Sequence, residues 1–160
     1  MHGPDPFGWV GAIIDDQFAV AGVAGEGSFG VVYRATHLGL DVPVAIKCLK
    51  VPPGLQDRER PALLATFRGE ARLLHQLSRR SAGIVQALAV GSATSPARVW
   101  TPYIVMEWLE GETLERDLKR RLDAELPRRT LDGALDLLAT AASALAVAHE
   151  EGVVHRDVKP

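Results

Sequence analysis

The sequence predicts an α+β fold, in which a β-sheet with one helix over residues 17–108 precedes a mainly helical segment over residues 109–160. Two observations support this prediction. The first part of the chain contains short runs rich in β-branched and aromatic residues, which are typical of strands. Residues 62–78 and 131–149 instead carry apolar side chains three and four positions apart, the spacing of one helix face. Residues 1–16, with two prolines and several glycines, predict a flexible leader.

The composition is that of an ordinary globular protein. Hydrophobic residues make up 47% of the chain, and 18 basic against 20 acidic residues give a net charge of −2, so no nucleic-acid partner is indicated. The most apolar stretch, residues 134–148, includes Asp136 and hydroxyl residues and is shorter than the roughly 20 apolar residues of a membrane span. It predicts a buried helix, and no membrane segment is expected in this chain.

The single cysteine, Cys48, excludes an internal disulfide and is typical of a reducing compartment. The first residues lack the basic and apolar regions of a secretory signal. We therefore expect a cytoplasmic location.

The expected strands and helices follow one another with short turns between them. The strand-like runs are residues 18–23, 31–35, 44–47, 84–90 and 99–108. Pro102 lacks a backbone N–H and predicts an edge position or a bulge near the start of the last run. Thr113 predicts the N-cap of a short helix that ends near Leu122. Gly152 predicts the end of the long helix that begins at Leu131.

A glycine-rich turn joins the first two expected strands. Its residues are Gly25, Glu26, Gly27, Ser28, Phe29 and Gly30. Glycine lets another group approach the main chain closely, so that backbone N–H groups can point at phosphate oxygens. The dinucleotide-binding fingerprint has the same glycine spacing but must open a helix, whereas the residues from Val31 to Tyr33 predict a strand. Taken alone, the turn remains open to a second interpretation as an ordinary flexible hairpin.

Lys47 lies at the end of the third expected strand. Because side chains alternate along a strand, Ala45 and Lys47 share one face, opposite their apolar neighbours. Gly30 and Val32 share a face of the second strand in the same way. In isolation, Lys47 would be interpreted as a strand lysine that extends its ammonium group to solvent.

Glu70 lies within the apolar stripe of the helix expected at residues 62–78. It follows Phe67 by three residues and precedes Leu74 by four, so it is expected to point with them toward the core. A carboxylate there is costly without a partner, and Lys47 is the available one. The alternative is a glutamate at the edge of the stripe.

Three motifs in this order resemble the protein kinases: the glycine-rich hairpin, the strand Val44-Ala45-Ile46-Lys47 and the closing sequence His155-Arg156-Asp157-Val158-Lys159-Pro160. The resemblance covers residues 18–160, and the lysine and proline after the aspartate are similar to the serine/threonine branch. It implies a kinase-like N-lobe, built from a five-stranded antiparallel sheet plus one helix. The first, helical part of a C-lobe is then expected over residues 109–160.

The resemblance also implies that the chain binds ATP. The backbone of residues 25–30 would cover the phosphates. Val32 and Ala45 would lie over and under one side of the flat adenine ring. Lys47, paired with Glu70, would hold the α- and β-phosphates.

Further roles come from the same resemblance. Met106 would be the gatekeeper at the back of the adenine site, and Glu107 and Leu109 would offer backbone groups to adenine. Asp157 would accept the proton of a substrate hydroxyl or orient that hydroxyl. Lys159 would lie near the transferred phosphate.

The implied function is transfer of the γ-phosphate of ATP to serine or threonine hydroxyls of a protein substrate. The family's Mg²⁺ ligands are expected beyond residue 160, so no metal ligand is expected within the chain. The 160-residue chain alone is therefore expected to be inactive. A non-catalytic nucleotide-binding or regulatory module is the alternative, and the motifs beyond residue 160 would separate the two.

Overall fold

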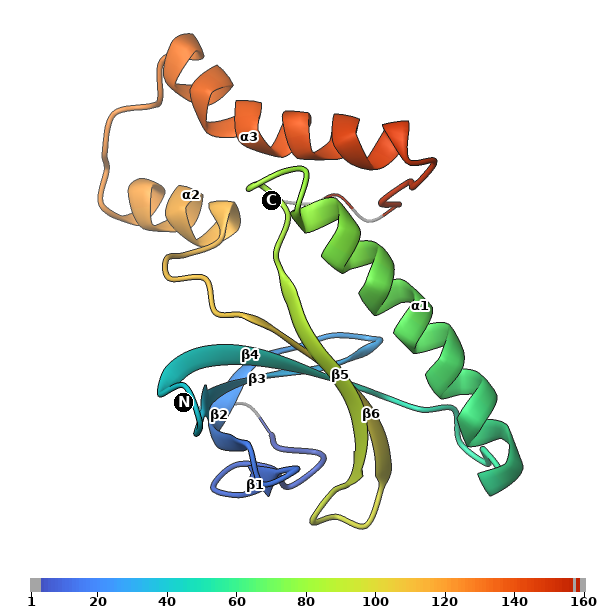
Figure 1. Cartoon of the computed structure of the whole chain (residues 1–160). Helices are drawn as coiled ribbons and strands as arrows, with labels where there is room; N and C mark the ends of the chain where they lie inside the picture. Colours follow the sequence, from blue (N-terminus) through green and yellow to red (C-terminus); the bar gives the residue numbers. More distant parts are fainter. Residues whose placement is uncertain (1–3, 157, 159–160) are drawn as a thin grey trace. The chain divides into compact units, whose positions relative to one another are not determined.

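The computed structural model of the chain describes residues 4–156 and residue 158. Its strands form a six-stranded sheet in the order β1-β2-β3-β4-β6-β5, in which all neighbouring strands pair antiparallel (Figure 1). The strands are β1 (Ile13–Ile14), β2 (Phe18–Glu26), β3 (Gly30–His37), β4 (Val42–Leu49), β5 (Ala87–Thr94) and β6 (Trp100–Glu107). The helices are η1 (Asp57–Glu59), α1 (Arg60–Ser78), α2 (Leu114–Asp123) and α3 (Leu131–Glu150).

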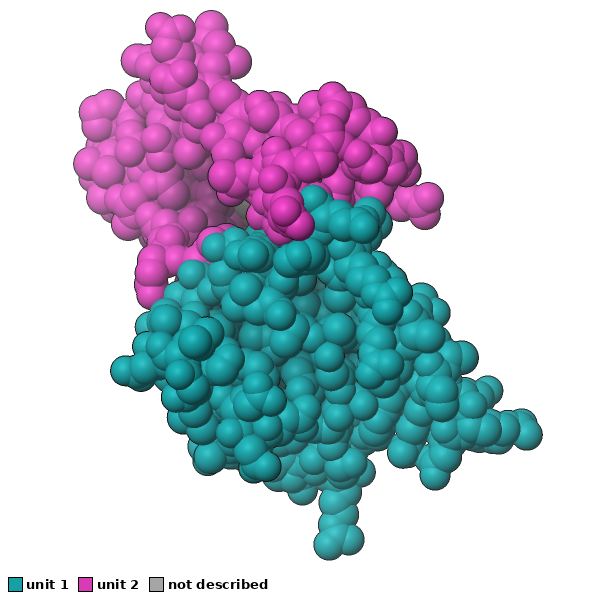
Figure 2. Space-filling model, in the orientation of Figure 1, with its two compact units in different colours: residues 1–76, 85–108 teal, residues 77–84, 109–160 magenta. Residues whose placement is uncertain are grey.

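The chain divides into two compact units (Figure 2). The first comprises residues 1–76 and 85–108, and therefore the whole sheet and most of α1. The second comprises residues 77–84 and 109–160, with α2 and α3. Residues 77–84, which were expected to belong with the sheet, are thus grouped with the helical unit.

The predicted α+β class and the antiparallel sheet are confirmed, but the sheet has one strand more than expected. The additional strand, β1, pairs with β2 through Ile13 opposite Ala19 and Ile14 opposite Phe18. A two-residue strand has too short an alternation to be recognised in a sequence.

The fifth strand along the chain, β5, begins and ends later than predicted. It was expected at residues 84–90 but extends from Ala87 to Thr94, because the small residues of its second half pair with β6. Gly91, opposite Tyr103, is needed there, since a Cβ atom would lie 2.6 Å from the tyrosine hydroxyl. Pro102 pairs only with β5, at Ser92, and the pairing of β6 with β4 begins at Tyr103. Because Pro102 lacks an N–H, this arrangement loses no hydrogen bond to β4. Pro102 thus occupies a local edge position, as the sequence predicted.

The structure corrects the expectation of a flexible leader over residues 1–16. The side chains of Phe7, Trp9 and Ile14 are buried in the hydrophobic core on one face of the sheet. The Asp5 carboxylate accepts hydrogen bonds from the Gly8 N–H at 2.9 Å and from the Tyr33 hydroxyl at 2.6 Å. Large apolar side chains and a capping aspartate thus fix this segment despite its prolines and glycines.

The helical unit follows the predicted helix boundaries closely. Thr113 caps α2 by accepting a hydrogen bond from the Arg116 N–H, and Thr130 caps α3 by accepting one from Gly133. Gly152, with φ +73°, follows the end of α3 as expected.

By length and composition, α3 would also pass as a membrane span: the mean hydropathy of its most apolar window is 1.5, and 11% of that window is buried. Core helices of soluble proteins meet the same criteria. The absence of a membrane segment therefore stays a prediction.

Candidate nucleotide-binding site

One face of the sheet gathers the residues that the sequence assigned to the adenine and phosphate groups. In the strand register, Val32 of β3 lies opposite Lys47 of β4, and Ala45 lies opposite Met106 of β6. Residues that pair directly across strands point to the same face. Val32, Ala45, Lys47 and Met106 therefore share one face of three adjacent strands.

The opposite face of the same strands is packed. The alternation predicted around Lys47 is confirmed, because Val44, Ile46 and Cys48 are each 0% exposed and belong to the main hydrophobic core. This core fixes which way each strand faces, and a shift of one residue would move Lys47 into it. The burial of one face thus places the half-buried Lys47 on the other.

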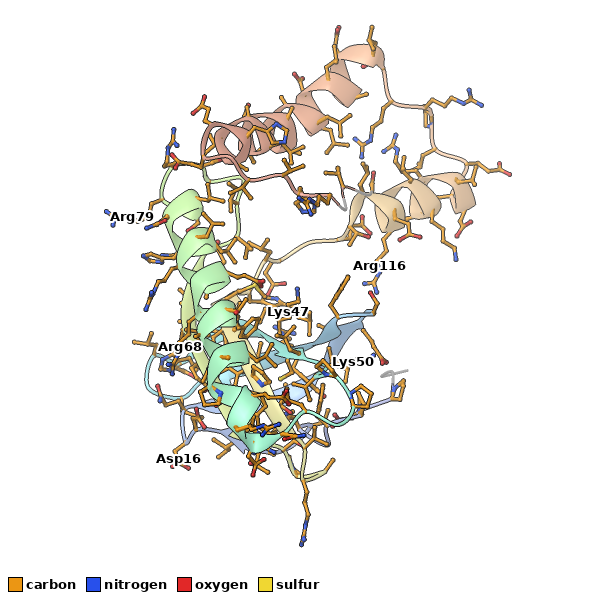
Figure 3. The ribbon with its side chains drawn as sticks, turned by 90° about the vertical axis from the view of Figure 1, so that its right-hand side faces the viewer. Asp16, Lys47, Lys50, Arg68, Arg79 and Arg116 are labelled. Carbon is orange, nitrogen blue, oxygen red and sulfur yellow. The ribbon has the colours of Figure 1, made fainter. Side chains whose placement is uncertain are left out.

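A cavity of about 430 Å³ lies between this face and α1. Lys47 lines it from the sheet, where Figure 3 marks it beside α1. The lining residues are Phe29, Lys47, Leu49, Leu63, Thr66, Phe67, Glu70, Leu74, Ile104 and Met106. Phe29, Lys47, Glu70 and Met106 are among the site residues that the sequence predicted.

Lys47 and Glu70 line the same cavity without forming an ion pair. No contact within 4.0 Å joins the ammonium and the carboxylate, although both residues lie in the described part of the chain. Glu70 is exposed, whereas Phe67 one helical turn before it is buried. The sequence argument required a partner because it placed the carboxylate in the core. Here solvent reaches the carboxylate, so the Lys47 partner is not needed.

The glycine-rich turn forms the predicted hairpin. β3 starts at Gly30, so no helix follows the turn and the dinucleotide interpretation is wrong. The Gly27 N–H donates to the Gly30 carbonyl at 2.9 Å, which closes the turn. No other atom lies within 4 Å of where a Cβ would stand on Gly25 or Gly27. These two positions are therefore open to an approaching ligand.

The tip of this turn also offers hydrogen-bond donors. Among the backbone hydrogen bonds of the described residues, none uses the N–H of Ser28 or Phe29. Phe29 is 73% exposed, so the turn is surrounded by solvent. Free N–H groups in a turn of this kind can bind an anion.

Lys50 is a functional candidate that the sequence analysis missed. Its ammonium donates to the Glu26 carboxylate at 2.7 Å and to the Gly27 carbonyl at 3.1 Å. Its own N–H donates to the Phe29 carbonyl at 3.0 Å. The opposite charges of Glu26 and Lys50 were visible in the sequence, but only the pairing of β2 with β3 and of β3 with β4 brings them together.

Arg34 is a second missed residue on the same sheet face. It lies opposite Ala45 in the register, and its guanidinium is 5.1 Å from the centre of the Trp108 ring. A guanidinium over an aromatic ring is attracted by the ring's negative face. A cation thus lies next to the position expected for adenine.

Of the two remaining residues predicted to contact adenine, Glu107 belongs to the first unit and Leu109 to the helical unit. Glu107 donates its N–H to the Gln86 carbonyl at 3.1 Å, and its side chain accepts from the Gln86 N–H at 2.7 Å. Leu109 is 64% exposed and belongs to the helical unit.

Asp157 and Lys159, the predicted catalytic residues, lie outside the described residues. Within residues 4–156 and residue 158, no group of three or more His, Cys, Asp or Glu side chains could hold a metal ion.

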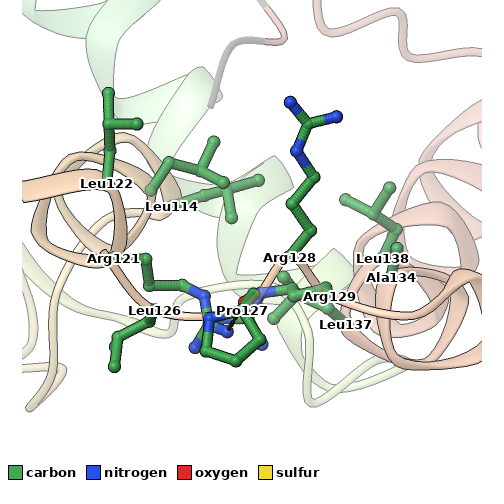
Figure 4. Close-up of a pocket in the computed structure, with 11 residues that line it drawn as sticks. Leu114, Arg121, Leu122, Leu126, Pro127, Arg128, Arg129, Ala134, Leu137 and Leu138 are labelled. Atoms are coloured by element: carbon green, nitrogen blue, oxygen red, sulfur yellow. Dashed lines mark hydrogen bonds between the residues drawn. The ribbon is translucent and has the colours of Figure 1, made fainter. Parts of the chain in front are cut away.

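A second cavity, of about 350 Å³, lies within the helical unit between α2 and α3 (Figure 4). Its lining includes the leucines Leu118, Leu122 and Leu138 and the arginines Arg121 and Arg128. The Arg121 guanidinium donates to the Pro127 carbonyl at 2.7 Å. None of the predicted site residues lines this cavity.

Comparison with known proteins agrees with the geometry of the first unit. Residues 18–160 match the protein kinase domain. The chain is 34% identical over 148 residues to the serine/threonine-protein kinase PknB of Mycobacterium tuberculosis, covering 92% of this chain and 22% of that protein. It is 34% identical over 151 residues to the serine/threonine-protein kinase PknA of the same organism, covering 94% of this chain and 32% of that protein. The chain thus spans less than a third of the length of these relatives. Because the domain match extends over most of its length, the chain belongs to the protein kinase family.

Proposed function

We propose that this chain binds ATP on the face of its sheet that carries Lys47 and forms part of a serine/threonine protein kinase. The observation that carries the proposal is the position of Lys47. It lies on the same face as Val32 and Ala45, and it lines a cavity together with Phe29 of the glycine-rich turn. A cation, an apolar surface and free backbone donors are what a triphosphate and a flat base require.

Each part of the site then has a chemical task. The side chains of Val32 and Ala45 offer an apolar surface to the adenine ring. The N–H groups of Ser28 and Phe29 donate to phosphate oxygens, and the Lys47 ammonium offsets their negative charge. Glu70, which lines the same cavity, is proposed to pair with Lys47 when α1 shifts on ATP binding.

The proposed reaction transfers the γ-phosphoryl group to a serine or threonine hydroxyl of a protein substrate. The hydroxyl oxygen forms a bond to the γ-phosphorus, and the bond from that phosphorus to the bridging oxygen of ADP breaks. Asp157 is the proposed acceptor of the hydroxyl proton, and Lys159 is proposed to lie near the moving phosphate. Mg²⁺ would supply charge neutralisation at the phosphates.

A non-catalytic nucleotide-binding or regulatory module is the second candidate. It is favoured by Lys47 and Glu70, which line one cavity without forming an ion pair. Phosphate transfer that depends on Asp157 would separate the two functions. A cytoplasmic location is proposed for either one, supported by the lone Cys48, which is buried as a free thiol.

Calorimetric titration with Mg-ATP tests the binding site. Lys47→Met is expected to lower ATP affinity by roughly 10- to 100-fold, because hydrogen bonds to charged groups contribute about 1.5–3 kcal/mol. Lys119→Met is the matched control, since Lys119 lies on α2 and does not line this cavity. Equal affinity of the parent and Lys47→Met, with both folded, would contradict the proposal.

A further inference from the structure

Lys50 connects the end of β4 to the glycine-rich turn through side-chain and main-chain contacts. Its ammonium contacts the Glu26 carboxylate and the Gly27 carbonyl, at 2.7 and 3.1 Å. Its backbone N–H also donates a hydrogen bond to the Phe29 carbonyl. Three hydrogen bonds from Lys50 therefore restrain the turn at the place where the nucleotide phosphates are proposed to bind.

The contact with Gly27 sets the direction of a neighbouring N–H. The Gly27 carbonyl and the Ser28 N–H belong to one planar trans peptide group, so they point in opposite directions. Because the carbonyl is directed at Lys50, the Ser28 N–H is directed away from it. That N–H has no backbone acceptor among the described residues. The Lys50 contact thus keeps a free donor turned outward.

The contact with Glu26 removes an electrostatic obstacle. Glu26 lies within the turn, and an uncompensated carboxylate there would repel a triphosphate. The two side chains are 37% and 35% exposed, so solvent screens the pair only in part. Neutralisation by Lys50 leaves the turn able to receive an anion.

We propose that Lys50 is a positioning residue for phosphate binding: it neutralises Glu26 and orients the peptide after Gly27, so that the turn accepts the phosphates of a nucleoside triphosphate. This inference rests on the proposed function, because it concerns the same site. Lys50 acts through the turn and leaves the adenine surface unchanged. Its removal should therefore weaken the binding of ATP but not of adenosine.

The test measures ATP and adenosine affinities of the 160-residue chain and its variants, by competition against a fluorescent adenine nucleotide. Lys50→Met is expected to weaken ATP binding by about three- to fivefold, the range of a partly exposed ion pair, and to leave adenosine binding unchanged. Lys50→Arg, which keeps the charge, should retain most of the ATP affinity. Lys119→Met is the control for loss of an exposed lysine.

Glu26→Gln provides a second measurement on the same contact. If Lys50 acts by neutralising Glu26, Lys50→Met should cost less ATP affinity in the Glu26→Gln background than in the parent. Equal ATP affinity of Lys50→Met and the parent, or an equal loss for adenosine, would overturn the inference while the proposed function stands. Failure of the parent itself to bind ATP would overturn the proposed function instead.

Discussion

Gly30 and Cys48 are in direct backbone contact across β3 and β4: a Cβ atom on Gly30 would lie 2.2 Å from the Cys48 carbonyl oxygen. This distance is far shorter than a van der Waals contact. The third glycine of the turn is thus required by strand packing, whereas Gly25 and Gly27 have open space around them.

The first prediction follows from this difference between glycines. Gly30→Ala is expected to lower the free energy of unfolding by about 1–3 kcal/mol, because the backbone of β4 must move to admit the methyl group. Gly27→Ala is the matched control and should leave stability nearly unchanged. Urea unfolding of the two variants measures both effects. Equal stability of the two would show that the Gly30 contact is not restrictive.

The second prediction concerns Asp5 and pH. Burial acts to raise the pKa of Asp5, but hydrogen bonds from the Tyr33 hydroxyl and from nearby backbone N–H groups outweigh it, so the pKa lies below the usual 3.8. A lowered folded-state pKa contributes stability that is complete above the unfolded value and is lost as the pH falls through the folded value. Asp5→Asn should therefore be less stable than the parent at pH 7, by about 1–2 kcal/mol.

Urea unfolding of both proteins between pH 7 and pH 2 measures this contribution. The difference between parent and Asp5→Asn should narrow as the pH falls below about 4. A stability difference between parent and Asp5→Asn that stays constant from pH 7 to pH 2 would mean that the charge of the Asp5 carboxylate does not stabilise the leader.

Local alternation and capping were enough to predict much of the fold from the sequence. The buried face of β4 was correctly assigned because one face of that strand is fully apolar. The boundaries of α2 and α3 were predicted from Thr113 and Gly152, since caps are local signals.

Contacts between distant residues could not be predicted in this way. The leader is held by Asp5 and Tyr33, which are 28 residues apart, and nothing local distinguishes it from a loop. The same is true of Lys50 and Glu26, which meet only through the register of three strands, β2, β3 and β4. For Glu70, helical spacing gave the correct face of α1, but spacing alone does not show that solvent reaches that face.

The third prediction concerns α3. Leu135 and Leu138 are 58% and 51% exposed, and the buried residues of this helix are Ala144 and Ala148. Little apolar burial supports the helix, so its amides should exchange hydrogen faster than those of β3 and β4. Hydrogen exchange of the monomer at low concentration measures this. Equal protection of α3 and the central strands would contradict the expected order.

The fourth prediction concerns activity. A protein made of these 160 residues is expected to transfer essentially no phosphate, because phosphoryl transfer depends on bound metal and the described residues contain no cluster of metal ligands. Incubation with labelled ATP and a generic basic protein measures the transfer. Turnover that disappears in Asp157→Asn would show that this chain is catalytic by itself.

The most direct test of the ATP site uses an acyl phosphate of ATP, whose acyl group forms an amide with the amine of a nearby lysine while ATP leaves. Peptide mass spectrometry then shows which lysine is modified. If the phosphates bind beside the glycine-rich turn, Lys47 should be labelled ahead of Lys119, and excess ATP should prevent the labelling. Labelling of Lys119 to the same extent as Lys47, or labelling of Lys47 that excess ATP does not reduce, would contradict the proposed site.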